Sequence, residues 1–183
     1  VVTLIQERFD LYYVGLFLVD PAEQWLVLQA SAGAGGGQLL ERGYRLRFGE
    51  GLVGWSIINA RARVASDALN NSVRVHTAEL SDTRSEVALP LRSRGQILGA
   101  LSVQSDVIHA FDDAFVSVLQ TIADSVAVAL DNARLLAESQ EALETARRAY
   151  GELSGQAWRE LLEAHRDWGY SYENQSINPV GGD

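Results

Sequence analysis

The chain has 183 residues, a hydrophobic fraction of 47% and a charged fraction of 21%, which is typical of one globular domain with an appendage. Its formal net charge of −9 disfavours phosphate backbones and anionic lipid, so we expect no nucleic-acid partner and no direct membrane contact. The sequence contains no cysteine, which excludes disulfides, thiolate nucleophiles and thioether-linked chromophores within it.

The sequence also bears on where the protein is found. Its runs of consecutive apolar residues are shorter than the roughly 18 to 20 that a membrane-spanning helix needs, and we expect a cytoplasmic module. Methionine is absent, so we expect Val1 to be an internal residue and the chain to be an excised module. That module can still belong to a membrane-anchored sensor.

The first part of the chain is predicted to form a short helix followed by antiparallel strands. Residues 4–9 have helical spacing, and residues 11–20 and 25–32, joined by an Asp-Pro turn, predict a β-hairpin. The glycines within 33–37 predict a flexible loop. Residues 44–48 alternate between apolar and basic side chains, which predicts a half-exposed strand.

The next segment combines glycines, a short helix and a long loop. Residues 52–62 predict the helix and residues 63–66 a short strand. Polar and turn-forming residues dominate 67–82, so we predict a long loop there with at most one helical turn. Loops of this length in compact domains are commonly functional or mobile.

The second half is predicted to form a hairpin and a long helix. Residues 85–93 and 97–105 are apolar on both faces and predict central strands, and Asp112 is expected to cap a helix that extends to Tyr150. We expect the helix to pack on the sheet as far as Asp131 and then to pair with a second copy of the chain. The apolar positions, separated by alternating steps of four and three, are Phe115, Leu119, Ile122, Val126, Ala129, Ala133, Leu136, Leu143 and Tyr150.

Residues 49–54 read GEGLVG and match the Gly-x-Gly-x-x-Gly pattern of dinucleotide-binding sites. Such a site requires a buried parallel strand before the glycines and a long crossover helix after them, and the flanking patterns predict neither. We therefore favour a structural role, in which Gly49 and Gly51 supply backbone angles unavailable to other residues and Gly54 allows close packing.

Four motifs occur in an order and spacing that resemble the GAF domain, the small-ligand-sensing module of bacterial signalling proteins and phytochromes. They read GEGLVGW, RVASDAL, DTRSEVALPLRSRGQILGALSVQS and AFDDAFVSVLQTIADSVAVALDNARL. The resemblance covers about residues 4–136. It implies an α+β fold, PAS-like in outline, with a central antiparallel sheet, helices on one face and a loop-covered pocket on the other.

This resemblance also implies an organisation and a role. We expect a GAF domain over residues 1–136, a projecting signalling helix over 137–150, and a short helix and polar tail over 151–183 that lead to a downstream region. The implied role is a non-catalytic sensor that binds a small molecule and relays its occupancy through the long helix of a homodimer. The alternative is a ligand-free dimerisation spacer.

The polar residues expected around the pocket supply the candidate ligand contacts. Arginines there can fork onto a carboxylate or phosphate of a ligand, although Arg84 can equally pair with Asp82 or Glu86. Trp55 can line the cavity floor or fill the core. The candidate ligand-binding residues are Trp55, Asp67, Asn70, Arg74, His76, Arg84 and Ser85.

Other chemistries find little support in the sequence. The three histidines His76, His109 and His165 lie far apart, so no metal site is predicted. Within the family, bilin attachment and free-methionine-sulfoxide reduction use a cysteine, which this chain lacks, and the Asn-Lys-Phe-Asp-Glu signature of cyclic-nucleotide binders is missing too. We therefore expect no enzyme activity and no cofactor other than an unidentified small molecule.

Overall fold

The computed structural model describes residues 1–22, 24–164, 169–173 and 176–180. The chain divides into two compact units, Val1–Ala133 and Arg134–Asp183. The first contains the mixed sheet-and-helix domain, and helix α4 (Asp113–Ala164) begins in the first unit and continues into the second.

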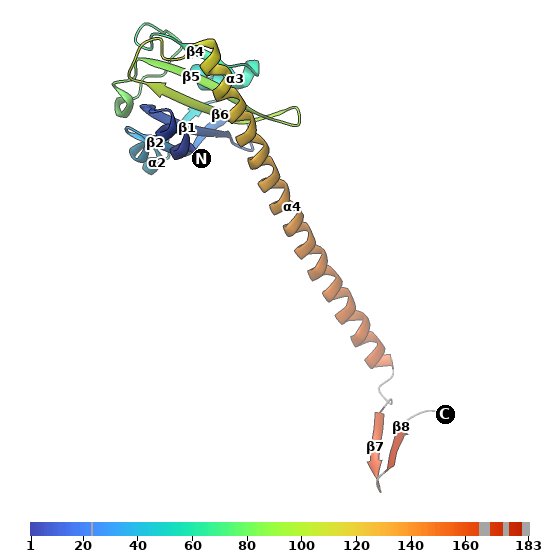
Figure 1. Ribbon diagram of the computed structural model, residues 1–183. Helices are drawn as coiled ribbons and strands as arrows, with labels where there is room; N and C mark the ends of the chain where they lie inside the picture. The colour runs from blue at the N-terminus through green and yellow to red at the C-terminus, as the bar shows by residue number, and fades with distance from the viewer. Residues whose placement is uncertain (23, 165–168, 174–175, 181–183) are drawn as a thin grey trace. The chain divides into compact units, whose positions relative to one another are not determined.

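A six-stranded antiparallel sheet forms the centre of the first unit, with strand order β3-β2-β1-β6-β5-β4 (Figure 1). The pairing of β1 with β6 joins the two predicted hairpins into one sheet. The predicted strands are therefore confirmed, with the second hairpin in the interior of the sheet. The strands are β1 (Tyr13–Val19), β2 (Trp25–Gly33), β3 (Arg45–Arg47), β4 (Arg63–Ala65), β5 (Ser85–Ser93) and β6 (Gln96–Ser105).

Helices cover both faces of this sheet. Helices α1 and α4 pack on one face, where Ile5 and Leu119 belong to the same buried cluster. The short helices pack on the other face, where Leu39 and Leu52 join a second cluster, beside the long segment between β4 and β5. The helices other than α4 are α1 (Val2–Arg8), α2 (Gly36–Glu41), α3 (Gly51–Asn59) and the 3-10 turn η1 (Ala78–Leu80).

Side-chain size differs between the two faces of the central strands. On the face toward α4, β5 carries Val87, Leu89 and Leu91, all buried. On the opposite face Ala88 on β5 and Ala100 on β6 are small. Because strand residues alternate between faces, these two alanines lie on the face away from α4 and leave room above them.

The predicted loop at 33–37 differs from the structure in part, because α2 begins at Gly36. Gly35 precedes it with a φ of 66°, a left-handed conformation that glycine adopts without strain. The Ser31 hydroxyl donates a 2.8 Å hydrogen bond to the Gly36 carbonyl, which fixes the turn against β2. Tertiary packing thus orders a stretch whose composition indicates a loop.

Two predictions about the C-terminal part are wrong. Helix α4 begins as expected, since the Asp112 carboxylate accepts a 2.7 Å hydrogen bond from the Phe115 N–H, but it continues through Gly151 and Gly155. A glycine costs a helix only about 1 kcal/mol relative to alanine, which the helix-forming residues around it can offset. The polar tail, for which the sequence predicts no strand, contains the antiparallel strands β7 (Gly169–Glu173) and β8 (Ser176–Val180). His165 lies outside the described residues.

Helix α4 is also more apolar than its short hydrophobic runs indicate. An 18-residue window within Asp113–Leu161 has a mean hydropathy of 1.5, so by length and composition alone this helix is able to cross a membrane. The same helix carries Leu119, Ala123 and Ala127, which are fully buried against the sheet. Packing on a sheet requires the same apolar composition, so the window alone assigns no membrane span.

Candidate ligand-binding site

The GEGLVG segment forms the turn between β3 and α3. Gly49 and Gly51 have φ values of +86° and +69°, and a side chain at Gly54 would collide with the backbone of Gly49. Strand β3 has three residues and pairs antiparallel with β2, unlike the parallel strand of a dinucleotide site. The structural role predicted for these glycines is confirmed, and the turn brings Leu52 to a cavity.

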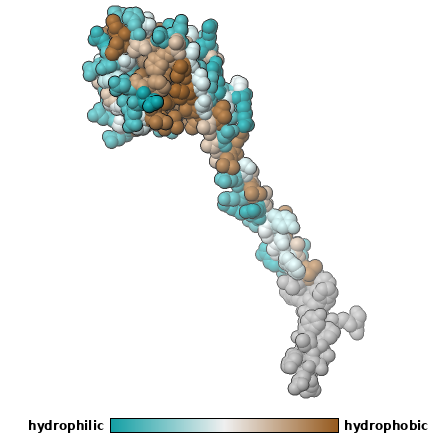
Figure 2. All heavy atoms as spheres, in the orientation of Figure 1, coloured by the Kyte–Doolittle hydropathy of each residue, from teal (hydrophilic) through white to brown (hydrophobic). Residues whose placement is uncertain are grey.

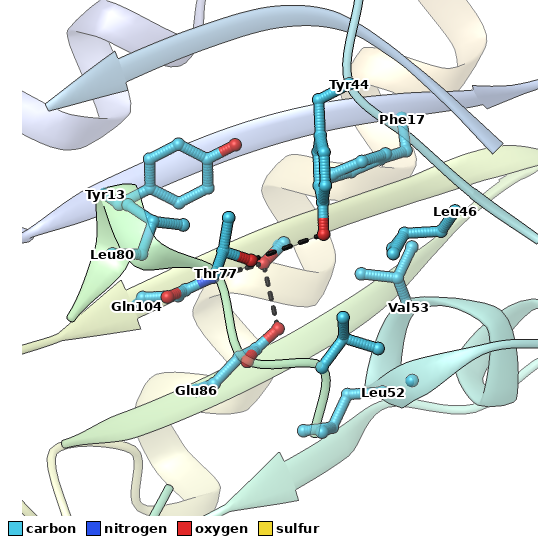
Figure 3. A pocket seen from close by; sticks show the side chains of 13 residues that line it. Tyr13, Phe17, Tyr44, Leu46, Leu52, Val53, Thr77, Leu80, Glu86 and Gln104 are labelled. Atoms are coloured by element: carbon cyan, nitrogen blue, oxygen red, sulfur yellow. Dashed lines mark hydrogen bonds between the residues drawn. The ribbon is translucent and has the colours of Figure 1, made fainter. Parts of the chain in front are cut away.

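That cavity lies on the face of the sheet that α3 covers, beneath the segment between β4 and β5 (Figure 3). Its volume is about 20 Å³, which is room for roughly one water molecule. Apolar side chains form one side and polar side chains the other. The lining residues are Tyr13, Phe17, Tyr44, Leu46, Gly51, Leu52, Val53, Val75, Thr77, Leu80, Glu86, Ser102 and Gln104.

A row of polar side chains crosses three adjacent strands at this cavity. Tyr13 of β1 is paired with Gln104 of β6, and Gln104 is paired with Glu86 of β5. The Tyr13 hydroxyl is buried and has no hydrogen-bond partner among the described residues. Burial raises the pKa of this hydroxyl, and the nearby Tyr44 and Glu86 raise it further. An unpaired buried hydroxyl is costly, so this row is suited to a polar partner.

Arg74 enters the site from the segment between β4 and β5, and its side chain is only 2% exposed. Its Nε donates to Glu86 Oε2 at 3.1 Å, and its Nη1 lies 3.0 Å from His76 Nδ1. Its Nη2 lies 3.5 Å from the Leu80 carbonyl oxygen and 3.4 Å from Gln104 Oε1. All three guanidinium nitrogens therefore face groups of the protein.

Glu86 is the charged residue that lines the cavity itself. Its Oε1 accepts a 3.1 Å hydrogen bond from the Ser102 hydroxyl, while Oε2 accepts from Arg74. Burial raises the pKa of the Glu86 carboxyl, and the charge and hydrogen bonds of Arg74 and Ser102 act in the opposite direction. A carboxylate buried this deeply needs a cationic partner.

Besides the ion pair of Arg74 with Glu86, two side-chain contacts hold the segment 66–82 over the cavity. The hydroxyls of Thr77 and Tyr44 share a hydrogen bond of 3.3 Å (Figure 3), and Glu79 forms a 2.9 Å ion pair with Arg42. Burial raises the pKa of the Tyr44 hydroxyl, an effect that the bond to Thr77 opposes. The prediction of a cavity covered by this segment agrees with the structure.

The structure brings only part of the predicted set to the cavity. Arg74 reaches it through Glu86, and His76 contacts Arg74 while remaining exposed. Asp67 and Asn70 form a surface turn, with a 2.6 Å hydrogen bond from the Asn70 amide to the Asp67 carboxylate. That hydrogen bond is the main cause that lowers the pKa of Asp67.

The other predicted residues lie away from the lining. Ser85 is buried and donates a 2.7 Å hydrogen bond to the Val107 carbonyl, and the Arg84 side chain is exposed. Trp55 is partly exposed, with the Arg63 guanidinium 4.4 Å from the centre of its ring, so it neither fills the core nor lines the cavity. Its ring instead packs beneath a cation at the surface.

Sequence reasoning missed most of the polar lining. Glu86 stands in the otherwise apolar strand sequence SEVALPL, and a lone carboxylate in a predicted central strand is a signal for a buried site. Ser102 and Gln104 lie two positions apart on the next predicted strand, which places them on one face. The strand order that places Tyr13 beside Gln104 becomes known only from the fold.

Comparison with known proteins matches residues 1–131 to the GAF domain family. A curated relative, GAF domain-containing protein A of Dictyostelium discoideum, is 32% identical over 113 residues, which make up 62% of this chain and 66% of that protein. The chain therefore spans just under two thirds of that relative.

Solved structures share the fold. The GAF domain from a phosphoenolpyruvate-protein phosphotransferase of Coxiella burnetii is 26% identical with a TM-score of 0.66, covering 73% of this chain and 80% of that one. A free methionine-R-sulfoxide reductase from Neisseria meningitidis, in complex with its substrate, is 26% identical with a TM-score of 0.64, covering 74% and 76%. The fold supports a small-molecule-binding regulatory module, and the reductase shares this fold. With residues 1–131 matched and the sheet order and cavity in place, this chain belongs to the GAF domain family.

Proposed function

We propose that this GAF domain is a non-catalytic regulatory sensor in signal transduction. A small molecule binds in the cavity beneath segment 66–82, and α4 relays its occupancy to another domain. The observation that carries the proposal is the buried polar row of Tyr13, Gln104 and Glu86, whose Tyr13 hydroxyl has no partner in the described part of the chain. A merely structural core would place apolar residues at these positions.

The composition of the site supports binding rather than catalysis. The chain contains no cysteine, so a thiolate-based reduction has no nucleophile within these residues. The carboxylate at the cavity, Glu86, is held by Arg74 and Ser102. Committed in this way, it is poorly placed to act as a general base.

The relay is proposed to act through a homodimer of α4. Leu136, Leu143 and Tyr150 follow one another at seven-residue spacing and are 62%, 53% and 76% exposed. Apolar residues at heptad spacing favour pairing with an identical helix. Figure 2 shows apolar side chains also gathered over α1 and the first turns of α4, where Leu4 and Val118 are exposed.

A second function, the ligand-free dimerisation spacer, is favoured by one observation. The cavity of about 20 Å³ has room for a single water molecule, and the side chain of Arg74 occupies the space beside it. On this alternative the polar row is an internal network and α4 alone acts, by pairing two copies.

Native mass spectrometry of gently purified protein, followed by thermal-shift measurements with the compounds identified, separates the two functions. The sensor predicts a small-molecule adduct that is lost in Val53→Phe, which fills the cavity, and kept in the control Ile58→Phe. Both residues lie on α3, but Val53 is 3% exposed and lines the cavity whereas Ile58 is 59% exposed. If neither the parent nor the variants carry a small-molecule adduct, the result supports the ligand-free spacer.

A further inference from the structure

We propose that Arg74 is the internal cation that occupies Glu86 when no ligand is bound. The sensed molecule is then a compact organic cation, with a guanidinium or ammonium group, that replaces Arg74 on Glu86. This inference rests on the proposed sensor function and names the chemical class that the site accepts. It follows from which charge faces the cavity, from how the covering segment is attached and from the cavity's size.

The charge that faces the cavity is negative. Glu86 lines it, together with the uncharged residues Gln104 and Ser102, whereas Arg74 is not among the lining residues. The guanidinium points its nitrogens at Glu86, His76, Gln104 and the Leu80 carbonyl, and so leaves at most one of its five N–H donors for an anion. We expected an arginine of the protein to bind a carboxylate of the ligand. The structure instead favours a carboxylate of the protein, Glu86, that binds a cationic ligand.

A ligand that enters must replace the charge that it displaces. A buried carboxylate left without its cation is strongly destabilising, so neutral or anionic molecules cannot compensate for the departure of Arg74. A cation on Glu86 restores the pair, and the remainder of the molecule would contact Phe17, Leu46 and Leu52. The unpaired Tyr13 hydroxyl offers such a molecule one further hydrogen bond.

The segment that carries Arg74 is attached so that it can move. Its start is anchored by backbone hydrogen bonds, from the Ala68 N–H to the Arg84 carbonyl and from the His109 N–H to the Ser66 carbonyl. Over residues 69–80, which carry Arg74, the backbone hydrogen bonds within the described part of the chain are local, from the Arg74 N–H to the Asn71 carbonyl and from the Leu80 N–H to the Thr77 carbonyl. The connections of residues 69–80 to the sheet are side-chain contacts, chiefly the ion pair of Arg74 with Glu86. Segments held in this way open at lower free energy than sheet strands do.

The size of the cavity fits this exchange. Room for one water molecule admits no organic ligand while Arg74 is in place. Withdrawal of the arginine side chain adds its own volume to the cavity, beside the carboxylate. Ligand binding and release of the segment are therefore one event, which supplies the two states that a sensor needs.

Chemical rescue tests the proposal, with methylguanidinium as the probe. Arg74→Ala should unfold at a lower temperature than the parent, and millimolar methylguanidinium should raise its melting temperature by several degrees. It should also bind the probe at least tenfold more tightly than the parent does, because no internal competitor remains. Sodium chloride at equal ionic strength should give no rescue. If Arg74→Ala does not fold alone, the probe should be required to recover folded protein on refolding.

The controls keep the charge argument separate from general stabilisation. Arg74→Ala/Glu86→Gln should lose the rescue, and Arg84→Ala, which removes a nearby exposed arginine, should show neither destabilisation nor rescue. Equal rescue of the double variant, or none of Arg74→Ala, overturns the proposal. A parent protein that binds a neutral or anionic compound with the Arg74–Glu86 pair intact keeps the sensor function but rejects the cation. A parent that binds nothing, while the rescue succeeds, rejects the sensor function and with it the sensed cation, and leaves Arg74 as the permanent partner of Glu86.

Discussion

Glu86 shows how the surroundings of one residue determine its charge chemistry. Water is excluded from its carboxylate, which raises its pKa, while Arg74 and Ser102 stabilise the ionised form. The same residue type at Glu50 sits at the surface and accepts a hydrogen bond from the Arg47 N–H. The difference arises from the fold, because the sequence alone does not distinguish the environment of one glutamate from that of the other.

The raised pKa of Glu86 predicts a pH dependence of stability. The folded state binds this proton more tightly than the unfolded state, so the free energy of unfolding should fall as pH rises from the ordinary carboxyl value of 4.5 through the raised folded value. Glu86→Gln should remove this fall, measured by urea unfolding across the acidic range. Asp124→Asn should remove the opposite slope, because the hydrogen bond from Arg92 lowers the pKa of Asp124. Identical slopes in parent and Glu86→Gln would contradict the assignment.

The glycine turn allows a second test at single residues. Gly51→Ala should lower the free energy of unfolding by on the order of 1 kcal/mol or more, since its φ of +69° strains any side chain and its Cβ would lie 3.0 Å from Val75 Cγ2. Gly37→Ala in α2 is the matched control, because its Cβ would meet no atom within 4 Å. Calorimetry of the parent with NAD should detect no binding, and clear binding would reverse the structural interpretation of GEGLVG.

At the scale of elements, two of the contacts that join the β5–β6 hairpin to α4 differ in character. Arg92 and Asp124 form a bidentate ion pair with distances of 3.0 Å and 2.7 Å, partly exposed to solvent. Beyond it, the buried Ser93 hydroxyl donates a 2.9 Å hydrogen bond to the Asp131 carboxylate. The strand that carries Glu86 thus ends on the helix that leaves the domain, which gives the proposed relay a physical connection.

These two contacts should contribute unequally to stability. Ser93→Ala removes a buried hydrogen bond to a carboxylate and should cost about 1–3 kcal/mol. Arg92→Ala breaks a pair that water screens and should cost no more than about 1 kcal/mol. Denaturant unfolding of the two variants in parallel measures the difference, and a larger loss in Arg92→Ala would show that exposure does not govern these contacts.

At the scale of the whole molecule, the exposed apolar positions of α4 predict self-association. A seam of this length on an isolated helix exposes apolar surface that a second copy would bury. Truncation after Leu136 should therefore weaken the dimer, as measured by sedimentation. Leu143→Asp should do the same, while Thr145→Asp, two positions further along and on another face, should leave the mass unchanged. If the truncated chain forms particles with as many copies as the parent does, this helix is excluded as the interface.

Much of the fold could be predicted from the sequence because its signals are local. The alternation in residues 44–48 and the apolar runs of the second hairpin gave strands within a few residues of their observed bounds. Local signals failed where tertiary packing or helix propagation outweighed them, at Gly36 and at Gly151. The site was less predictable, since Arg74 alone of the expected residues meets the polar row.

The sequence by itself determined the family, the order of the elements and the absence of thiol chemistry, because each depends on residue types and on neighbours along the chain. Only the tertiary structure decided that Tyr13, Gln104 and Glu86 form one row, since strand order sets contacts between residues about 20 to 90 positions apart. It also decided that Arg74 is buried against a carboxylate instead of facing a ligand. The physical reason is desolvation: once buried, each charge must find its partner within the fold.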